Sequence, residues 1–367
     1  MHSALRRKPR FALLSAAVVV IALGVVVALV VSSHGPSKPR VATTTPTSPV
    51  APAGERLFAT DSIWNAAIPA PAPVDPASGQ LVGALEREVT SELRRGIGPW
   101  IATSKASTPI YQVPAGQPTV RVALDDPTLW WRVSLQAAFA AVPIPAGAQP
   151  ATGPDAQMTI WQPSTDKLWE FFHMRKQADG WHAAWGGAIE DVSQSAGYYS
   201  TGSWPGALPQ WGATATSLPV AAGVITLADL RRGQIDHALA IDLPAPRQGV
   251  FAWPAQRSDG TGGPDTIPEG AQLRLDPAVD LARLSLPPLT RMIAQAAQTY
   301  GIIVRDQTHD GISFYAQDAA QSGGDDLYYG AHGIFGGRTP TQLLAAFPWS
   351  DLQVLQMHLC SRAPCEQ

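Results

Sequence analysis

The chain has 367 residues, of which 45% are hydrophobic and 15% are charged, a composition too apolar for a disordered protein and too polar for a polytopic membrane protein. Residues 1–40 hold six Lys or Arg and no acid, so the remainder is acidic and is not expected to bind nucleic acid. With 34 Pro and 32 Gly but a single Asn, the turns must be made mostly by Gly, Pro and Asp, and many short elements are expected.

The N-terminal region predicts a membrane anchor. Residues 11–31 form an uncharged apolar run long enough to span a bilayer as a helix, and four basic residues between positions 6 and 10 place the N-terminus in the cytoplasm. A cleaved signal peptide is the alternative, which would make the protein secreted. We therefore expect a cytoplasmic segment (1–10), a transmembrane anchor (11–31), a Pro/Thr/Ser-rich linker (32–54) and one extracytoplasmic β-rich domain (55–367).

Short strands dominate the predicted elements of this domain. Nine segments show period-2 alternation or enrichment in β-branched and aromatic residues: 119–124, 157–162, 167–174, 181–192, 235–243, 249–253, 271–275, 301–305 and 312–316. Helices are predicted after a capping box at Thr226, from Pro288 to just before Gly301, and at Thr339 and Ser350. The sequence thus predicts a mostly β fold, a β-sandwich or jelly-roll with a few peripheral helices, preceded by one transmembrane helix.

Two neighbouring predicted strands form a hairpin whose turn ends in Asp179-Gly180. A two-residue loop at these positions places Glu170 opposite Ile189. Glu170 is then a diagonal neighbour of Asp191, with Cα atoms roughly 7 to 8 Å apart. Two carboxyl groups would therefore share one face of the sheet.

Such a pair is what glycoside hydrolysis uses, with carboxyl groups about 5 to 10 Å apart. Apolar neighbours would raise the pKa of Glu170 and make it the proton donor. Asp191 or Asp155 would be the second carboxylate. The alternative is structural, with Asp191 capping a turn and Glu170 paired to Arg175 or Lys176.

Four further residues are candidates for contact with substrate. His237 lies in an alternating apolar stretch and points inward, either as a base or hydrogen-bond donor in a cleft or as an ordinary core histidine. Arg257 is a candidate ligand for substrate. Trp185 and Trp211 fall in or beside a Gly-rich region and are candidate platforms for stacking on sugar rings, with core packing as the alternative.

No cofactor or metal site is predicted. The HExxH, GxxxxGK[ST], GxSxG, GxGxxG and CxxC motifs are absent from the sequence. Aspartates such as Asp306 and Asp310 suggest calcium only weakly, because solvated loops look the same. Cys360 and Cys365 predict a small disulfide loop in an oxidising compartment, with two free thiols as the alternative.

Five stretches carry a family resemblance: 211–219, 233–239, 253–259, 267–270 and 300–306. On these residues the chain resembles a family of exported proteins from high-GC Gram-positive bacteria, over most of its length from Trp64 to Trp349. Members often show Asp-x-His-Met where this chain has Asp155-Ala-Gln-Met158, and no catalytic residue carries over. By analogy the fold is similar to the jelly-roll or concanavalin-like sandwiches of polysaccharide lyases and glycosidases.

The sequence favours a membrane-tethered, extracytoplasmic carbohydrate-active enzyme, a glycoside hydrolase acting on a cell-wall or environmental polysaccharide. A polysaccharide lyase is one alternative, with His237 as base and Arg257 neutralising a uronate. A non-catalytic glycan-binding or envelope-scaffold protein is the other.

Overall fold

The computed structural model describes residues 56–126, 132–322, 327–330 and 332–366. The predicted cytoplasmic segment, anchor and linker lie outside these residues. Among the helices that are described, none combines the length and the apolar character needed to cross a bilayer. The described residues form a mixed α/β architecture built on four small sheets, none of them closed into a barrel.

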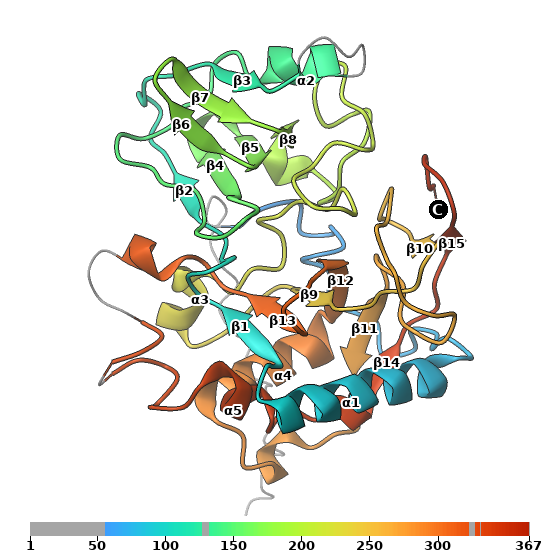
Figure 1. Ribbon diagram of the computed structural model, residues 1–367. Helices are drawn as coiled ribbons and strands as arrows, with labels where there is room; N and C mark the ends of the chain where they lie inside the picture. Colours follow the sequence, from blue (N-terminus) through green and yellow to red (C-terminus); the bar gives the residue numbers. More distant parts are fainter. Residues whose placement is uncertain (1–55, 127–131, 323–326, 331, 367) are drawn as a thin grey trace, which may run out of the picture. The chain divides into compact units, whose positions relative to one another are not determined.

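A mixed six-stranded sheet lies at the centre (Figure 1). Its strands, in spatial order, are β1 (Trp100–Ala102), β13 (Ser313–Tyr315), β9 (Leu239–Leu243), β12 (Ile302–Gln307), β11 (Gln272–Leu275) and β14 (Leu352–Val354). Strands β9 and β12 run parallel, whereas β13 and β11 run antiparallel to them. The carboxyl ends of β9 and β12 therefore meet at one edge.

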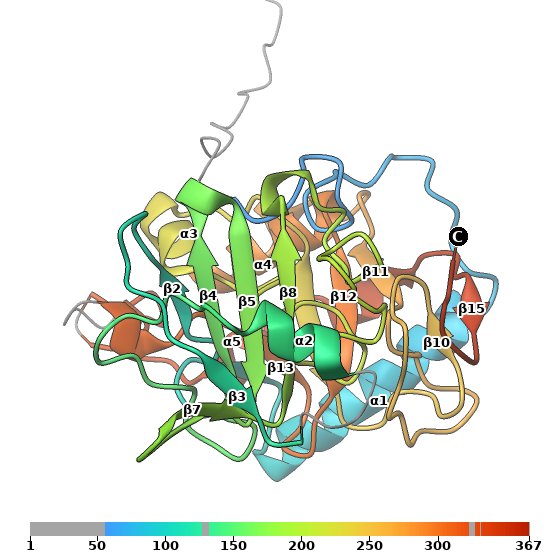
Figure 2. The same ribbon diagram turned by 90° about the horizontal axis from the view of Figure 1, so that it is seen from above.

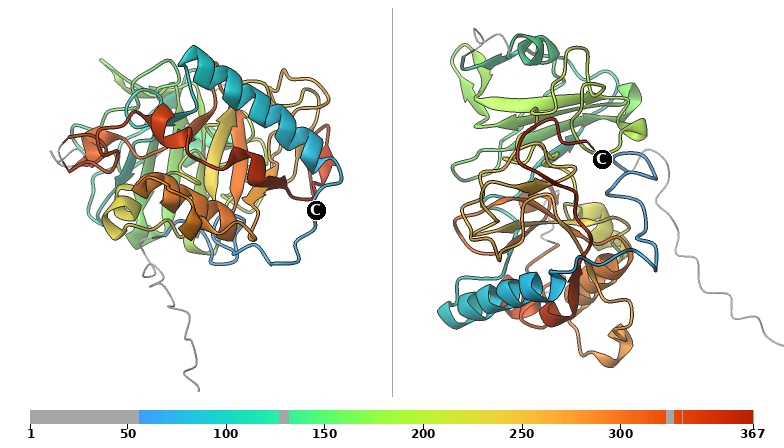
Figure 3. Two further views of the ribbon diagram at one scale, coloured as in Figure 1. Left: turned by 90° about the horizontal axis from the view of Figure 1, so that it is seen from below. Right: turned by 90° about the vertical axis from the view of Figure 1, so that its right-hand side faces the viewer.

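Helices cover one face of this sheet (Figure 3, left). They are α1 (Ser78–Arg95), α4 (Pro288–Thr299) and α5 (Pro340–Leu344). Alternate residues of β9, Leu239, Ile241 and Leu243, pack against this layer with Ile302 and Val304 of β12. The period of two then sends the residues between them to the opposite face.

A second β layer lies over that opposite face (Figures 1 and 2). Its four-stranded sheet runs in the order β2 (Ile110–Gln112), β4 (Met158–Gln162), β5 (Lys167–Phe172) and β8 (Trp185–Glu190). Ile160 and Leu168 of this sheet share a core cluster with Ala240 and Ile303 of the six-stranded sheet. The two sheets are thus held by common packing.

Smaller elements complete the structure. A three-stranded sheet and a short helix lie above the four-stranded sheet (Figure 2): β3 (Val122–Leu124), β7 (Gly180–Ala183), β6 (Arg175–Gln177) and α2 (Val133–Ala138). The remaining elements are α3 (Leu227–Arg232), the pair β10 (Phe251–Ala252) and β15 (Leu359–Cys360), and 3₁₀ turns at Pro163–Thr165, Val192–Gln194, Leu281–Arg283, Ala319–Ser322 and Trp349–Asp351.

The predicted fold class is correct only in part. Each of the nine predicted segments contains a strand, and the helices expected at Thr226, Pro288 and Thr339 are confirmed. At Ser350 only a 3₁₀ turn forms. The predicted β-sandwich or jelly-roll does not describe the whole fold. In a β-sandwich the outer face of each sheet is exposed, whereas here α1 and α4 cover the outer face of the six-stranded sheet. The Cys360–Cys365 disulfide is confirmed.

Candidate active site

The predicted hairpin register is wrong by two residues. Gln177 pairs with Gly180, so the loop is Ala178-Asp179, and Glu170 lies opposite Gly187 instead of Ile189. Gly180 has a φ of 133°, a conformation that suits glycine, and this lets it join the strand instead of the turn.

The shift separates the two carboxyl groups that the sequence brought together. Strand β8 ends at Glu190, and Asp191 follows it, exposed and with a φ of 53°. Asp191 lies four positions beyond Gly187, the partner of Glu170, and this corresponds to roughly 13 Å along an extended strand. Asp191 is therefore not a diagonal neighbour of Glu170.

Glu170 lies in the interior. Its side chain is 0% exposed and accepts hydrogen bonds from the Tyr199 hydroxyl at 3.0 Å and the Ala221 backbone N–H at 2.8 Å. Burial raises the pKa of Glu170 to about 7, against the lowering effect of these hydrogen bonds. The carboxyl group thus ties the segment around residues 199–221 to the sheet. It is not among the residues lining the cavity described next.

A cavity of about 640 Å³ lies between the two β layers. Asp155, Phe172 and Trp185 contribute from the four-stranded sheet and the loop before it. Asp242, Asp306 and Tyr315 contribute from the six-stranded sheet, and the loops add Lys105, Arg257, Asp259, His309 and Asp310. We call this the acidic cavity. Carboxylates and aromatic rings from two layers face one space.

Strand register explains the acids on the six-stranded sheet. Asp242 alternates with Ile241 and Leu243 and so points away from the helices. Strand β12 carries a bulge between Val304 and Asp306, and Asp306 pairs with Asp242. The extra residue, Arg305, breaks the alternation and leaves Asp306 on the cavity side.

Arg305 holds Asp242 in place. Its guanidinium group is completely buried, lies 3.4 Å from Asp242 Oδ2, and donates to the Val220 carbonyl at 2.7 Å. The same group lies 4.2 Å from the centre of the Tyr315 ring. Burial raises the pKa of Asp242, although the positive charge of Arg305 opposes this shift. Asp242 Oδ1 is buried and has no hydrogen-bond partner among the residues that the structure describes.

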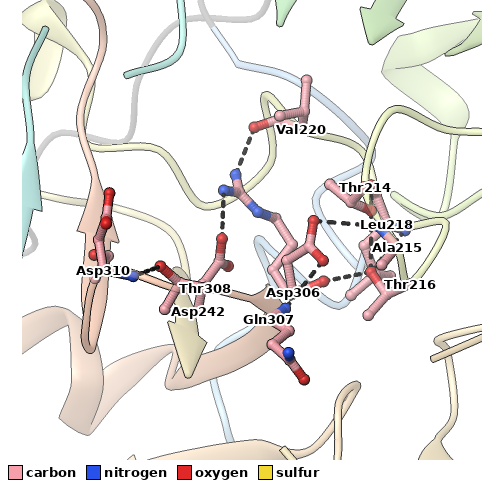
Figure 4. A network of polar contacts seen from close by, with 12 residues as sticks. Thr214, Ala215, Thr216, Leu218, Val220, Asp242, Asp306, Gln307, Thr308 and Asp310 are labelled. Atoms are coloured by element: carbon pink, nitrogen blue, oxygen red, sulfur yellow. Dashed lines mark hydrogen bonds and ion pairs between the residues drawn. The ribbon is translucent and has the colours of Figure 1, made fainter. Parts of the chain in front are cut away.

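Asp306 is the second acid of the strand pair. Its Oδ2 accepts from the Ala215 backbone N–H at 3.1 Å (Figure 4). Burial, followed by the negative charge of Asp242, raises the pKa of Asp306 well above its usual value. Two neighbouring carboxyl groups, Asp242 and Asp306, therefore lie on the side of the acidic cavity formed by the six-stranded sheet, and both hold a proton more tightly than an exposed aspartate does.

Three of the seven residues that the sequence predicts to act in catalysis or substrate binding line this cavity: Asp155, Trp185 and Arg257. The guanidinium group of Arg257 donates to Ser217 Oγ at 2.9 Å and to the Thr214 carbonyl at 2.7 Å. These bonds fix its position on the wall.

His237 and Trp211 lie elsewhere. Trp211 is fully buried, so it presents no ring face for a sugar. The ring nitrogens of His237 lie 3.2 Å from Asp229 Oδ2 and 2.8 Å from the Ala238 carbonyl, in a separate cavity of about 140 Å³. Burial acts to lower the pKa of His237, but the Asp229 carboxylate outweighs it and raises the pKa. Both nitrogens are engaged, which argues against a role as base.

Sequence reasoning missed Asp242 and Tyr315 as site residues. The signal for Asp242 was present, because it is an acid at an interior position of a predicted apolar strand. The sequence indicates Asp306 only as a weak calcium candidate together with Asp310, and it lies one residue beyond the end of the predicted strand.

Comparison of this chain with family models, curated proteins and solved structures finds no match.

Proposed function

We propose that the protein is an extracytoplasmic glycoside hydrolase that binds a polysaccharide in the acidic cavity. The observation that carries the proposal is that Asp155, from the loop before β4, and Asp242, from β9, line the same cavity as the indole of Trp185. Both carboxyl groups line the acidic cavity, and the negative charge of Asp155 adds a small contribution to the rise in the pKa of Asp242 that burial causes. A cavity with paired acids and aromatic walls suits a sugar ring between acid and base.

Asp242 and Asp155 replace Glu170 and Asp191 in the proposed mechanism. One carboxyl group protonates the leaving oxygen and the other assists attack at the sugar carbon. Trp185 stacks on a sugar face, and Arg257 binds sugar hydroxyl groups. The predicted anchor and the disulfide support an extracytoplasmic location.

A lyase acting on uronates receives less support. The acidic lining repels a negatively charged sugar. His237 and Arg257, which such an enzyme would pair, line different cavities.

The test is incubation of the full-length chain with a panel of cell-wall and plant polysaccharides, scoring new reducing ends. We expect Asp242→Asn and Asp155→Asn each to lower the rate at least about 100-fold, the scale of a lost acid–base group. The matched control is Asp265→Asn, which changes an exposed carboxylate that accepts a hydrogen bond from Gln80 and lies off the acidic cavity.

Other outcomes decide against hydrolysis. Ultraviolet absorbance from unsaturated sugar ends would identify a lyase. Retarded migration in polysaccharide gels with no cleavage would identify a binding protein. Unchanged rates in both variants would remove these two carboxyl groups from the mechanism.

A further inference from the structure

Three carboxylates converge beside the acidic cavity. Asp259, Glu269 and Asp306 each place one carboxylate oxygen so that the three oxygens lie within 4.8 Å of one another. Asp259 follows β10, Glu269 precedes β11, and Asp306 belongs to β12. Three separate chain segments therefore bring negative charge to one point.

Glu269 has a buried carboxylate oxygen that lacks a hydrogen-bond donor or cation among the described residues. Its side chain is 0% exposed, and its Oε2 accepts a hydrogen bond from the Asp259 backbone N–H at 3.2 Å. Its Oε1 is buried with no hydrogen-bond partner in the described part of the chain. A buried carboxylate oxygen left in this way is costly unless a positive group binds it.

The protein's own cations do not fill this role. Among the described residues, no ion pair within 4.0 Å includes Asp259, Glu269 or Asp306. The guanidinium group of Arg257 is within electrostatic range of all three carboxylates, but it donates its hydrogen bonds to Ser217 Oγ and to the carbonyls of Gly212 and Thr214. Arg305 is directed at Asp242.

We propose that Asp259, Glu269 and Asp306 bind a calcium ion. The donors are all oxygens, which suit a hard cation, and calcium accepts six to eight oxygen ligands in flexible geometry. Asp259 and Asp306 also line the acidic cavity, which gives the ion an entry path and room for water ligands. The ion would cross-link three segments of the cavity wall. This inference does not depend on the proposed hydrolase activity.

Calorimetric titration of the full-length, chelator-treated chain with calcium alone tests the site. We expect one ion per chain, and at least a tenfold loss of affinity in Glu269→Gln, which keeps the size of the side chain and removes its charge. Asp259→Asn provides a second variant at a more exposed position, should the buried substitution prevent folding, and the same loss is expected.

Asp310→Asn is the matched control. Asp310 lies on the same cavity but outside the three-oxygen cluster, where it pairs with Lys105 at 3.2 Å. Its substitution should leave calcium affinity within about twofold. Absence of calcium binding by the unaltered chain, or equal affinity in Asp259→Asn and in any folded Glu269→Gln, would overturn the proposal. Because the readout is binding, a failure of the hydrolase proposal would not produce either result.

Discussion

Single carboxyl groups in this protein behave according to what surrounds them. Glu170 and Asp242 both have raised pKa values because both are buried. Glu170 is enclosed by hydrogen-bond donors in the core, whereas Asp242 borders a cavity of about 640 Å³. A raised pKa therefore belongs to a structural carboxyl group in the core at Glu170 and to a candidate catalytic group at Asp242.

Glu170 should make stability depend on pH. Its pKa is near 4.5 in the unfolded chain and about 7 in the folded protein, so the folded protein binds the proton more tightly. The resulting stabilisation is complete below pH 4.5 and is lost as pH rises through 7, by up to about 3 kcal/mol. In Glu170→Gln this part of the pH dependence should disappear. Denaturant unfolding from pH 5 to pH 8 measures it, and an unchanged profile in the variant would contradict the assignment.

Trp185 should contribute to sugar binding at the level of a stacked aromatic ring. We expect Trp185→Ala to weaken polysaccharide binding about two- to twelvefold, since such stacking contributes about 0.5 to 1.5 kcal/mol. Affinity electrophoresis with the cleaved or retained polysaccharide measures the change. Trp100→Ala is the control, because Trp100 is 39% exposed on β1 and does not line the acidic cavity. Equal weakening in both variants would argue against a platform at Trp185.

At the level of elements, the sequence predicts best where local chemistry marks a boundary. Thr226 and Asp229 form the expected capping box, and Gly233 ends the helix in a left-handed conformation. The longest of the described helices, α1, is not predicted from the sequence. It begins at Ser78, after Ala77, which provides no side-chain cap, and it has no acid in its first turn, so the local signals for a helix start are missing. Its stability comes from packing of its apolar stripe on the sheet.

The acidic cavity could be predicted only in fragments. Asp155, Trp185 and Arg257 were chosen from the sequence and do line it. Their meeting with Asp242 depends on long-range pairing and on a bulge, neither of which leaves a local pattern. The choice of Glu170 shows the converse problem, because alternation gives the face of a strand but does not say whether that face opens to solvent.

Gly187 of β8 tests the packing between layers. A Cβ at this position would lie 2.4 Å from the Tyr199 ring, on the residue that binds Glu170. We expect Gly187→Ala to destabilise the protein by about 1 to 3 kcal/mol through overpacking. Gly79→Ala in α1 meets no atom within 4 Å and should instead add up to about 1 kcal/mol through helix propensity. Denaturant unfolding of both variants checks the opposite signs, and similar shifts would contradict this account.

At the scale of the whole molecule, strand pairing, a disulfide and a side-chain hydrogen bond hold the C-terminal segment in place. Strand β15 pairs with β10 through Phe251 and Cys360, and the disulfide then closes the chain back to Cys365. The Gln256 amide also donates to the Cys365 carbonyl at 2.9 Å. These contacts hold the end of the chain beside the segment that leads to Asp259.

Removal of the disulfide should lower the free energy of unfolding only modestly, because the bond closes a short loop and so restricts the unfolded chain little. We expect the double variant Cys360→Ser, Cys365→Ser to lose about 2 kcal/mol of unfolding free energy. Thermal and denaturant unfolding with and without reductant provide the measurement. Reductant should shift the unaltered protein and leave the double variant unchanged. A reductant effect on the variant would point to another cause.

The bulge in β12 has a wider consequence for comparing this chain with others. Two proteins could both carry an aspartate at the end of this strand and differ by a single inserted residue before it. In the one without the insertion, the acid would follow Val304 directly, and regular alternation would still turn it toward the cavity opposite Asp242. An alignment that ignores the bulge would then place the two aspartates one position apart and understate the likeness of the two sites, and the face of the strand would be the better guide to shared chemistry.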